Sequence, residues 1–517
     1  MKCTLQRGGT SFRPAPPAGV RRGFAVGYAA WLCAALSLSG CQFAPPLRTP
    51  SVPTRRGYTA AAAPRTAGIG APARIPAQRF VYGALLEHPW WRTFRSPRLD
   101  ALVEEAFRHS PTVAAAEAEL RVARANVQKS QSVFYPQVGL DLGASRTKNS
   151  SANFGGRLRG STFSLYSGSV AVSYYPDFFG INQLVYRGSE AQMHAQQDAL
   201  AAARLTLAGN LVDAAIGTAE AAAELNASLA AVTAERRLLR YTEAQYRGGS
   251  VNYASVLAQR GQLAMSESQL PPLRQQLAAY RHLLAVLLGR SPSDRRVRIF
   301  TLRDFTLPRR IPVALPSTLL RERPDIRSAV EQMRYALTEI GIAKAQFFPL
   351  VTLTAAGGLS ALTPGKLFDG SSSIWSIGGS LAQPLFEGGK LRAQERSAYA
   401  AYADVRAVYR STVLGAFQQV ADALRALQHD GAAARDQSRL THALAAQVRQ
   451  AAAGYRSGAT DVSPLLAAKI AYENARVTSA AITAVRLQDT TALFVALGGD
   501  LRPRPTGAAD QPTRRRP

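Results

Sequence analysis

Apolar and polar residues alternate in four short segments of the chain. The segments lie at 138–144, 170–174, 351–355 and 375–381. Their alternating positions are Val138, Leu140, Leu142, Ala144, Val170, Val172, Tyr174, Val351, Leu353, Ala355, Trp375, Ile377, Gly379 and Leu381. A period of two predicts β-strands with one apolar face. Because stretches rich in Ser, Gly and Asn separate the segments pairwise, we expect two long hairpins and four strands per chain.

A helical period occupies most of the remaining chain. No proline occurs between Pro176 and Pro271 or between Pro384 and Pro464, so each interval is predicted to contain one long helix. As a helix, residues 389–455 extend roughly 100 Å. Their apolar positions are Val405, Tyr409, Val413, Ala416, Val420, Leu424 and Leu427. These positions recur every 11 residues, a period that favours a nearly straight or slightly right-handed path. A solvated single helix does not explain such a stripe, which requires partner helices.

Landmarks in the first half of the chain recur in the second half. Phe-Tyr-Pro at 134–136 returns as Phe-Phe-Pro at 347–349, 213 positions later. Tyr-Arg-Gly-Gly at 246–249 returns as Tyr-Arg-Ser-Gly at 455–458, 209 positions later. Landmarks in the same order at a nearly constant offset indicate one structural unit written twice.

Each repeat has the same predicted order: lead-in helix, β-hairpin, long helix and return helix. The lead-in helices, 99–133 and 325–346, end at the aromatic-aromatic-Pro step, because the residue before a proline avoids the helical conformation. We divide the chain into a signal peptide (1–40), an extended tether (41–86), repeat 1 (87–289), a connector in the equatorial region (290–323), repeat 2 (324–499) and a flexible C-terminal tail (500–517).

The N-terminus has the layout of a secretory signal. Arg21 and Arg22 precede a mostly apolar stretch at 24–38, which is too short to span a bilayer. It ends in Leu-Ser-Gly-Cys, which looks like the lipobox of bacterial lipoproteins, so Cys41 is the expected site of acylation by diacylglycerol and palmitate. An Asp after the cysteine favours the inner membrane in enteric bacteria, whereas Gln42 favours the outer membrane. The alternative is an ordinary cleavage site with an incidental cysteine.

Four amphipathic strands do not close a barrel, and an open sheet edge is not tolerated in lipid. Three chains supply twelve strands, within the range of outer-membrane barrels. The long helices carry charges throughout, so they must project into an aqueous compartment. The predicted fold is therefore an α+β membrane protein: a trimeric 12-stranded transmembrane β-barrel, continued by a long periplasmic α-helical barrel and built from two internal repeats.

Several motifs together carry a family resemblance over residues 41–499. They are Trp90-Trp91 followed by Leu99 and Leu102, the stretch Leu319-Leu320-Arg321-Glu322-Arg323-Pro324-Asp325-Ile326-Arg327, Ala345-Gln346-Phe347-Phe348-Pro349, and the Tyr-Arg-x-Gly turns. As a set they resemble the TolC/OprM-type outer-membrane factors, and most closely the NodT-type lipoproteins of RND efflux systems. The resemblance implies a passive homotrimeric duct in the outer-membrane lipid. Through it, drugs or other small molecules leave from a periplasmic adaptor (membrane fusion) protein and an inner-membrane RND-type pump.

The resemblance also implies roles for the turns that end the long helices. The adaptor-docking periplasmic tips correspond to Arg247, Gly248, Gly249 and Ser250 in repeat 1, and to Ser457, Gly458, Ala459 and Thr460 in repeat 2. Tyr455, Arg456 and Asp461 are candidates for the gate or constriction. In a three-fold tube, Asp461 would form a ring of three carboxylates that attracts cations. The alternative is local: Tyr455 and Arg456 finish a helix, and Asp461 begins the next one as an N-cap.

Composition and charge restrict the other classes of function. The 517 residues carry a net charge of +28, which suggests a nucleic-acid partner, but the arginines are scattered and a secreted lipoprotein does not meet nucleic acid. Much of the excess lies in the signal, tether, connector and tail. We find no P-loop, no nucleophile elbow and no His spacing typical of a metal site, so no catalytic, cofactor or metal site is predicted. The remaining alternative is the outer-membrane channel of a type I protein-secretion system, which shares this architecture.

Overall fold

The computed structural model describes residues 43–50, 58, 78–84, 86, 89–150, 161–294 and 298–499. The signal peptide, Cys41, most of the tether and the C-terminal tail lie outside these residues. The described chain forms two compact units. The strand unit comprises Phe134–Gln183 and Gly341–Gly388 together with residues 43–45, and the helical unit comprises the rest. This division follows packing and cuts across the two sequence repeats.

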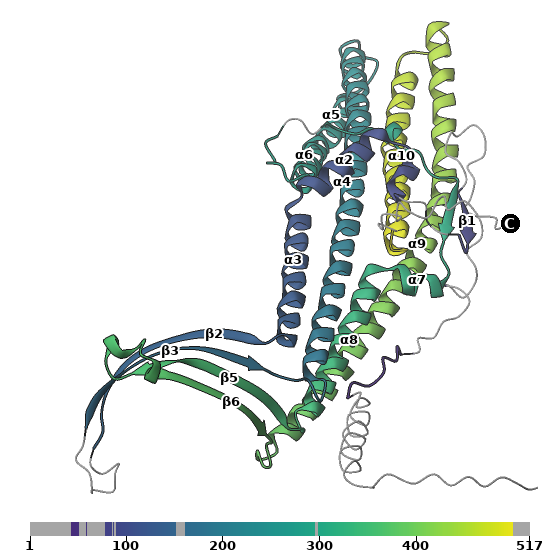
Figure 1. Cartoon of the computed structure of the whole chain (residues 1–517). Coiled ribbons are helices and arrows are strands. Elements are labelled where there is room, and N and C mark those ends of the chain that lie inside the picture. Colours follow the sequence, from purple (N-terminus) through teal and green to yellow (C-terminus); the bar gives the residue numbers. More distant parts are fainter. Residues whose placement is uncertain are drawn as a thin grey trace, which may run out of the picture. The chain divides into compact units, whose positions relative to one another are not determined.

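The strand unit is one antiparallel sheet of four strands in the order β2-β3-β5-β6 (Figure 1). The strands are β2 (Gln137–Lys148), β3 (Thr162–Tyr174), β5 (Leu350–Ala361) and β6 (Ser373–Ala382). They coincide with the four segments of alternating sequence. Successive side chains of a strand point to opposite faces of the sheet, and residues paired across two strands share a face. Because Val138 pairs with Val172 and Leu353 with Gly379, the predicted apolar positions lie on one face of the sheet. The outer strands β2 and β6 are exposed along their whole length.

Aromatic rings pack beside the ends of the strands. Phe348, just before β5, lies 4.9 Å from Phe43 and stacks on Phe179 at 5.1 Å between ring centroids. Both distances lie in the range of favourable aromatic pairs. Phe179 follows β3 and Phe43 follows Cys41 by two positions, so the chain on the C-terminal side of the predicted acylation site contacts the sheet rim.

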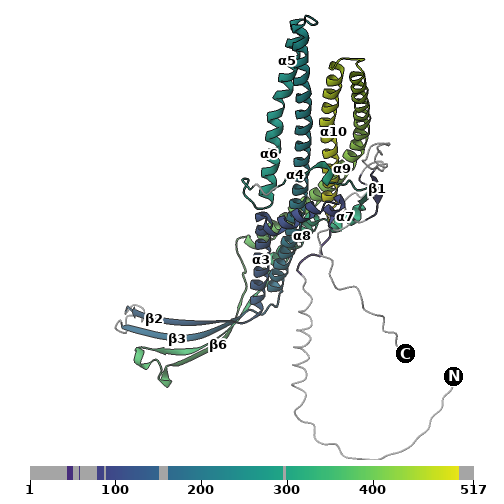
Figure 2. The ribbon, with the colours of Figure 1, turned by 90° about the horizontal axis from the view of Figure 1, so that it is seen from above.

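The helical unit is built around two helices of 67 residues each, α4 (Ile181–Arg247) and α9 (Lys390–Arg456). Figures 1 and 2 both show α9 running beside α10 (Ser463–Ala496), and α4 beside α5 (Tyr253–Ser268) and α6 (Leu270–Leu287). The other helices are α2 (Pro97–His109), α3 (Pro111–Gln131), α7 (Pro316–Glu322) and α8 (Pro324–Ala345), with 3-10 turns at Trp90–Phe94, Ser132–Phe134, Leu302–Asp304, Pro364–Lys366 and Gly370–Ser372.

The apolar stripe predicted on the second long helix is the buried face of α9. Its buried members are Tyr409, Val413, Ala416, Val420, Leu424 and Leu427, and Val405 packs partly buried against them. In α4, one stretch has the length and hydropathy of a membrane-crossing helix, but half of it is buried inside the protein. Packing against other helices accounts for its apolar character. At Gly217 of α4 an added Cβ would lie 2.5 Å from the ring of Tyr280, so only glycine allows this close approach.

Three local features differ from the sequence-based expectation. The lead-in helix of repeat 1 is broken into α2 and α3, because Ser110 is extended before Pro111, which begins α3 at a position suited to proline. The return helix of repeat 1 is likewise divided at Gln269, two residues before Pro271. A parallel pair, β1 (Arg79–Tyr82) and β4 (Arg310–Val313), joins the end of the tether to the connector and was not predicted.

Candidate gate and docking tips

The first tip ends α4 in a glycine turn. The backbone N–H of Gly249 donates to the carbonyl of Tyr246 at 3.0 Å, and that of Ser250 donates to Gln245 at 2.9 Å. These two bonds, with Gly249 at φ +73°, form a Schellman motif, in which a left-handed residue closes the helix. The Asn252 side chain then caps α5 by accepting from the N–H of Ser255 at 3.0 Å.

The second tip repeats this geometry at the end of α9. Gly458 has φ +74°, and its N–H donates to the carbonyl of Tyr455 at 3.2 Å. The N–H of Ala459 donates to Gly454 at 3.0 Å, which completes a second Schellman motif. The equivalence of Gly249 and Gly458, inferred from the repeat, therefore holds at the level of backbone conformation. Tip residues Arg247 to Ser250 and Ser457 to Thr460 are all exposed.

Asp461 makes one local contact and one contact between the repeats. Its Oδ1 accepts from the N–H of Ser463, the first residue of α10, at 3.0 Å. The N-cap of α10 is Val462, however, so Asp461 precedes the position that the local alternative gave it. It also accepts a hydrogen bond from the Tyr241 hydroxyl of α4. Partial desolvation, followed by the hydrogen bond and charge of Asp461, raises the pKa of Tyr241.

The other two gate candidates, Tyr455 and Arg456, differ in their contacts. Tyr455 is near enough to Tyr241 to influence its ionisation, and 48% of its side chain is exposed. Arg456 donates from Nε to the carbonyl of Ala452 in its own helix at 3.2 Å. The structure thus brings Tyr455 and Asp461 together with Tyr241, a residue that the sequence analysis missed. Nothing in the motif pattern pointed to Tyr241, because the contact joins two repeats.

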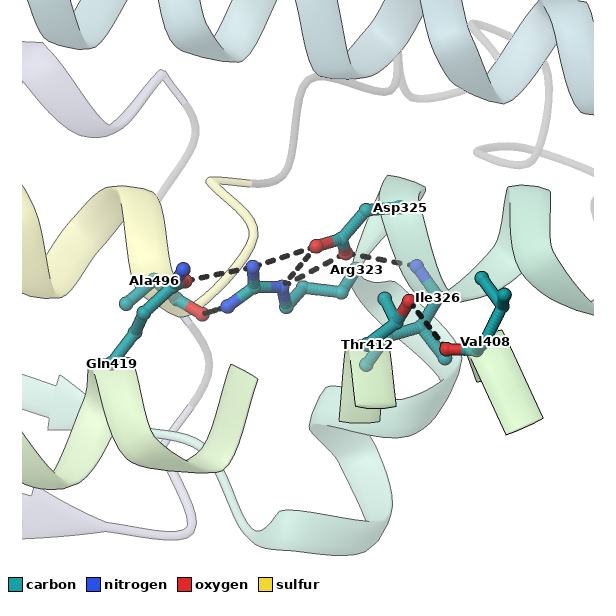
Figure 3. Close-up of polar contacts among 7 residues, drawn as sticks. All are labelled: Arg323, Asp325, Ile326, Val408, Thr412, Gln419 and Ala496. Atoms are coloured by element: carbon teal, nitrogen blue, oxygen red, sulfur yellow. Dashed lines mark hydrogen bonds and ion pairs between the residues drawn. The ribbon is translucent and has the colours of Figure 1, made fainter. Parts of the chain in front are cut away.

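The Arg-Pro-Asp-Ile-Arg stretch binds the connector to the end of repeat 2 (Figure 3). Arg323 is 8% exposed and pairs with both carboxylate oxygens of Asp325, at 2.9 Å from Nε and 2.7 Å from Nη2. It also donates to Gln419 of α9 at 2.8 Å and to the carbonyl of Ala496 of α10 at 2.9 Å. Arg327 forms an ion pair with Asp198 of α4. The motif therefore connects α8 to α4, α9 and α10 and is structural.

A group of charged residues lies between the long helices. Asp213 of α4 and Asp430 of α9 both lie close to Asp489 of α10. Burial, then the negative charge of Asp489, raises the pKa of Asp213 to about 7. Burial, then a hydrogen bond and charge from Asp489, raises the pKa of Asp430 to about 7, against a smaller opposite effect of Arg486. Arg486 is fully buried and donates to Gln78 at 2.9 Å.

Within the described residues, no three His, Cys, Asp or Glu side chains gather in a way that would hold a metal ion. The acylation candidate Cys41 lies outside the described part of the chain.

Comparison with known proteins agrees with this geometry over nearly the whole chain. A family model described as "Outer membrane efflux protein" matches residues 102–290 and 315–499. The pyoverdine export outer membrane protein OpmQ of Pseudomonas putida is 29% identical over 441 residues, which cover 83% of this chain and 91% of OpmQ. The cation efflux system protein CusC of Escherichia coli K12 is 25% identical, over 90% of this chain and 98% of CusC. The solved outer-membrane channel OprN superposes with a TM-score of 0.76 at 27% identity, covering 89% of this chain and 99% of OprN.

Proposed function

Because the chain belongs to the outer membrane efflux protein family, we propose that it works with a periplasmic adaptor and an inner-membrane RND-type pump. It is an outer-membrane channel subunit of a tripartite efflux system, with the fold of trimeric channels that join a β-barrel to a long helical barrel. One observation carries the proposal most directly. A single chain combines a four-stranded amphipathic sheet with two 67-residue helices that end in matching glycine turns.

The chain is a passive duct, and we assign it no catalytic step. The relatives differ in cargo: one is named for pyoverdine export and another for cation efflux. If the pump selects the substrate, channels of one fold can export such different molecules. We therefore propose small molecules as the exported class and leave the choice among them to the pump.

The two tips are proposed as the adaptor-docking surface. Both present exposed residues at the end of a long helix, at Arg247 to Ser250 and Ser457 to Thr460. The adaptor can therefore contact the ends of the long helices at these exposed turns. The repeat relation gives each protomer two similar docking sites, one at each tip.

Asp461 is proposed as the acidic element of the gate, held in place by Tyr241. In the trimer, three copies of Asp461 form a ring that attracts cations. Asp461→Ala removes the charge and the bond from Tyr241, so we expect a higher open probability and weaker cation preference in planar bilayers. Tyr241→Phe is the matched control, because it removes the bond and keeps the carboxylate: gating should change while cation preference stays. Unchanged conductance and selectivity in the Asp461→Ala trimer would refute the role.

We also propose that Cys41 is acylated and that the tether, repeat, connector and tail boundaries follow the sequence-based division. The contact of Phe43 with Phe348 supports a tether that starts at the sheet rim. Mass spectrometry of the mature N-terminus tests the lipid directly, since an unmodified Cys41 would exclude the anchor.

The function is tested by deleting the chromosomal copy and measuring susceptibility to antibiotics, dyes, solvents and metal ions. We expect sensitisation to at least one class and rescue by the wild-type chain. Secreted protein in the culture supernatant is measured in parallel: its loss without any sensitisation would favour the type I secretion channel and overturn the efflux proposal.

A further inference from the structure

The parallel pair β1–β4 turns a side that carries arginines to solvent. Phe80 and Ile311, which pair across the two strands, are buried in the core of the helical unit. Their neighbours Arg79 and Arg310 point to the opposite side of the pair and are exposed. Figures 1 and 2 both show β1 at one side of the helical unit, beyond α9. The pair therefore packs by one side and presents the other to its surroundings.

The register of the pair brings like charges together. Arg79 lies opposite Arg310, and the N–H of Arg79 donates to the carbonyl of Arg309, also exposed, at 2.8 Å. Adjacent strands are about 4.7–4.9 Å apart, and like charges opposite each other destabilise a sheet. Within the described residues, none of these three side chains forms an ion pair with a carboxylate. We call Arg79, Arg309 and Arg310 the arginine face.

The positive charge continues along the connector that leads to β4. Residues 298–313 contain one acidic residue, Asp304, and four exposed arginines: Arg298, Arg303, Arg309 and Arg310. The Oδ2 of Asp304 accepts from the N–H of Thr301 at 2.8 Å and forms a capping box with it. The single carboxylate therefore stabilises a local turn, and the segment keeps an excess of positive charge.

The terminal segments of the chain do not supply the missing negative charge. Residues 42–77 contain five arginines and no acidic residue, and residues 500–517 contain five arginines and two aspartates. Both segments are net positive, so the arginine face repels them. The anionic partner is therefore expected from another molecule.

The arginine face lies on the helical unit, whereas the membrane-spanning sheet forms the strand unit. In channels of this family the helical barrel stands in the periplasm, where the peptidoglycan wall carries carboxylates on its repeating stem peptides. We propose that the arginine face binds these carboxylates and so attaches the channel to the wall, a role separate from export. A guanidinium pairs with a carboxylate through two parallel hydrogen bonds, and bound carboxylates offset the repulsion between Arg79 and Arg310. Arginines spread over an open strand pair suit a repeating polyanion better than a single small ligand.

Co-sedimentation with isolated peptidoglycan sacculi tests the proposal. Full-length trimers in nanodiscs of neutral lipid are mixed with sacculi and centrifuged, and the protein in the pellet is measured. The triple variant Arg79→Gln, Arg309→Gln and Arg310→Gln should bind about tenfold more weakly than wild type, because each exposed ion pair contributes modestly. Binding of the wild type should also weaken as salt rises from about 0.1 M to about 1 M, which shortens the Debye length from ~10 Å to ~3 Å.

Two controls separate the arginine face from general charge. The variant Arg237→Gln, Arg240→Gln and Arg449→Gln also removes three exposed arginines, from the long helices, and should bind like wild type. Sacculi whose carboxylates have been converted to amides should not bind the wild-type trimer. Arg309→Glu alone, outside both strands, reverses one charge without altering the strand pair and should also weaken binding.

Equal weakening in the two triple variants overturns the assignment of the site, and undiminished binding to amidated sacculi overturns its chemistry. Tighter binding of the wild type to phosphatidylglycerol vesicles than to sacculi would identify lipid phosphates as the ligand and also overturn the proposal. Trimer size is recorded for each variant, and Arg309→Glu decides the outcome if the triple variant does not assemble. Rescue of the deletion strain by the arginine-face variant is expected, so loss of wall binding and loss of export are distinguishable.

Discussion

Arg323 should be the residue of the Arg-Pro-Asp-Ile-Arg stretch on which the helical unit depends most. Its guanidinium is buried and joins Asp325 to Gln419 and to the carbonyl of Ala496. Arg323→Ala leaves these acceptors without their donor. Arg321 is the matched control, because it lies two residues earlier and is exposed.

The magnitude follows from how well each abandoned acceptor can be solvated. The Asp325 side chain is 39% exposed, so water replaces much of its ion pair. The Ala496 carbonyl loses a buried hydrogen bond to a charged donor, and Gln419, whose side chain is exposed, loses a part-buried one, for a total of about 3 kcal/mol. For a chain of this length, the unfolding entropy makes 1 kcal/mol equal to roughly 1 °C in Tm, so the expected decrease is about 3 °C. Arg323→Lys keeps the charge but not the planar fork and should fall between wild type and alanine.

The assay is circular dichroism at 222 nm during heating of the detergent-solubilised trimers, at one scan rate for all variants. Arg321→Ala should melt within about 0.5 °C of wild type, as is usual for surface substitutions. Equal decreases for Arg321→Ala and Arg323→Ala, or no decrease for Arg323→Ala, would refute the argument that the buried network stabilises the helical unit.

Two further predictions concern the sheet and the buried carboxylates. A Cβ at Gly358 of β5 would lie 2.2 Å from the carbonyl oxygen of Gly168, whereas one at neighbouring Gly357 meets nothing within 4 Å. Gly358→Ala should therefore lower the yield of heat-resistant trimer on gels severalfold and Gly357→Ala should not; equal yields would contradict it. The pKa of Asp430 is raised to about 7 in the folded state, above its ordinary value near 4, so its contribution to stability is present below pH 4 and is lost as pH rises through 7. Asp430→Asn should remove this loss and raise Tm by about 1–2 °C at pH 8, after allowance for solvent screening, with little change at pH 5. The same Tm difference at both pH values would show that Asp430 does not titrate in this range.

The regular elements were predictable because their signals are local. The long helix predicted at 389–455 is α9, Lys390–Arg456, since glycines bound it on both sides. The strands followed from strict alternation, and the trimer from the open edges they leave. The break at Pro111 also has a local signal, a serine before a proline that suits the first turn of a helix.

Contacts between distant segments were not predictable from one sequence. The Tyr241–Asp461 contact joins α4 of repeat 1 to the turn before α10 of repeat 2. A periodic pattern predicts which face of a helix is buried, but it does not identify the residues that pack against that face. The β1–β4 pair is four residues long and lies in Arg- and Pro-rich surroundings where alternation is too short to detect. The stretch around Arg323 was visible as a motif, but its role depends on Gln419 and Ala496, which approach only in the folded helical unit.

Single-channel recording of the purified trimer in planar lipid bilayers tests the central claim most directly. We predict discrete current steps, one pore per trimer, that need no energy source and occur more often in the Asp461→Ala protein. A trimer of the correct size that gives no current steps, with either the wild-type chain or the Asp461→Ala variant, would contradict the assignment of this protein as a passive outer-membrane duct.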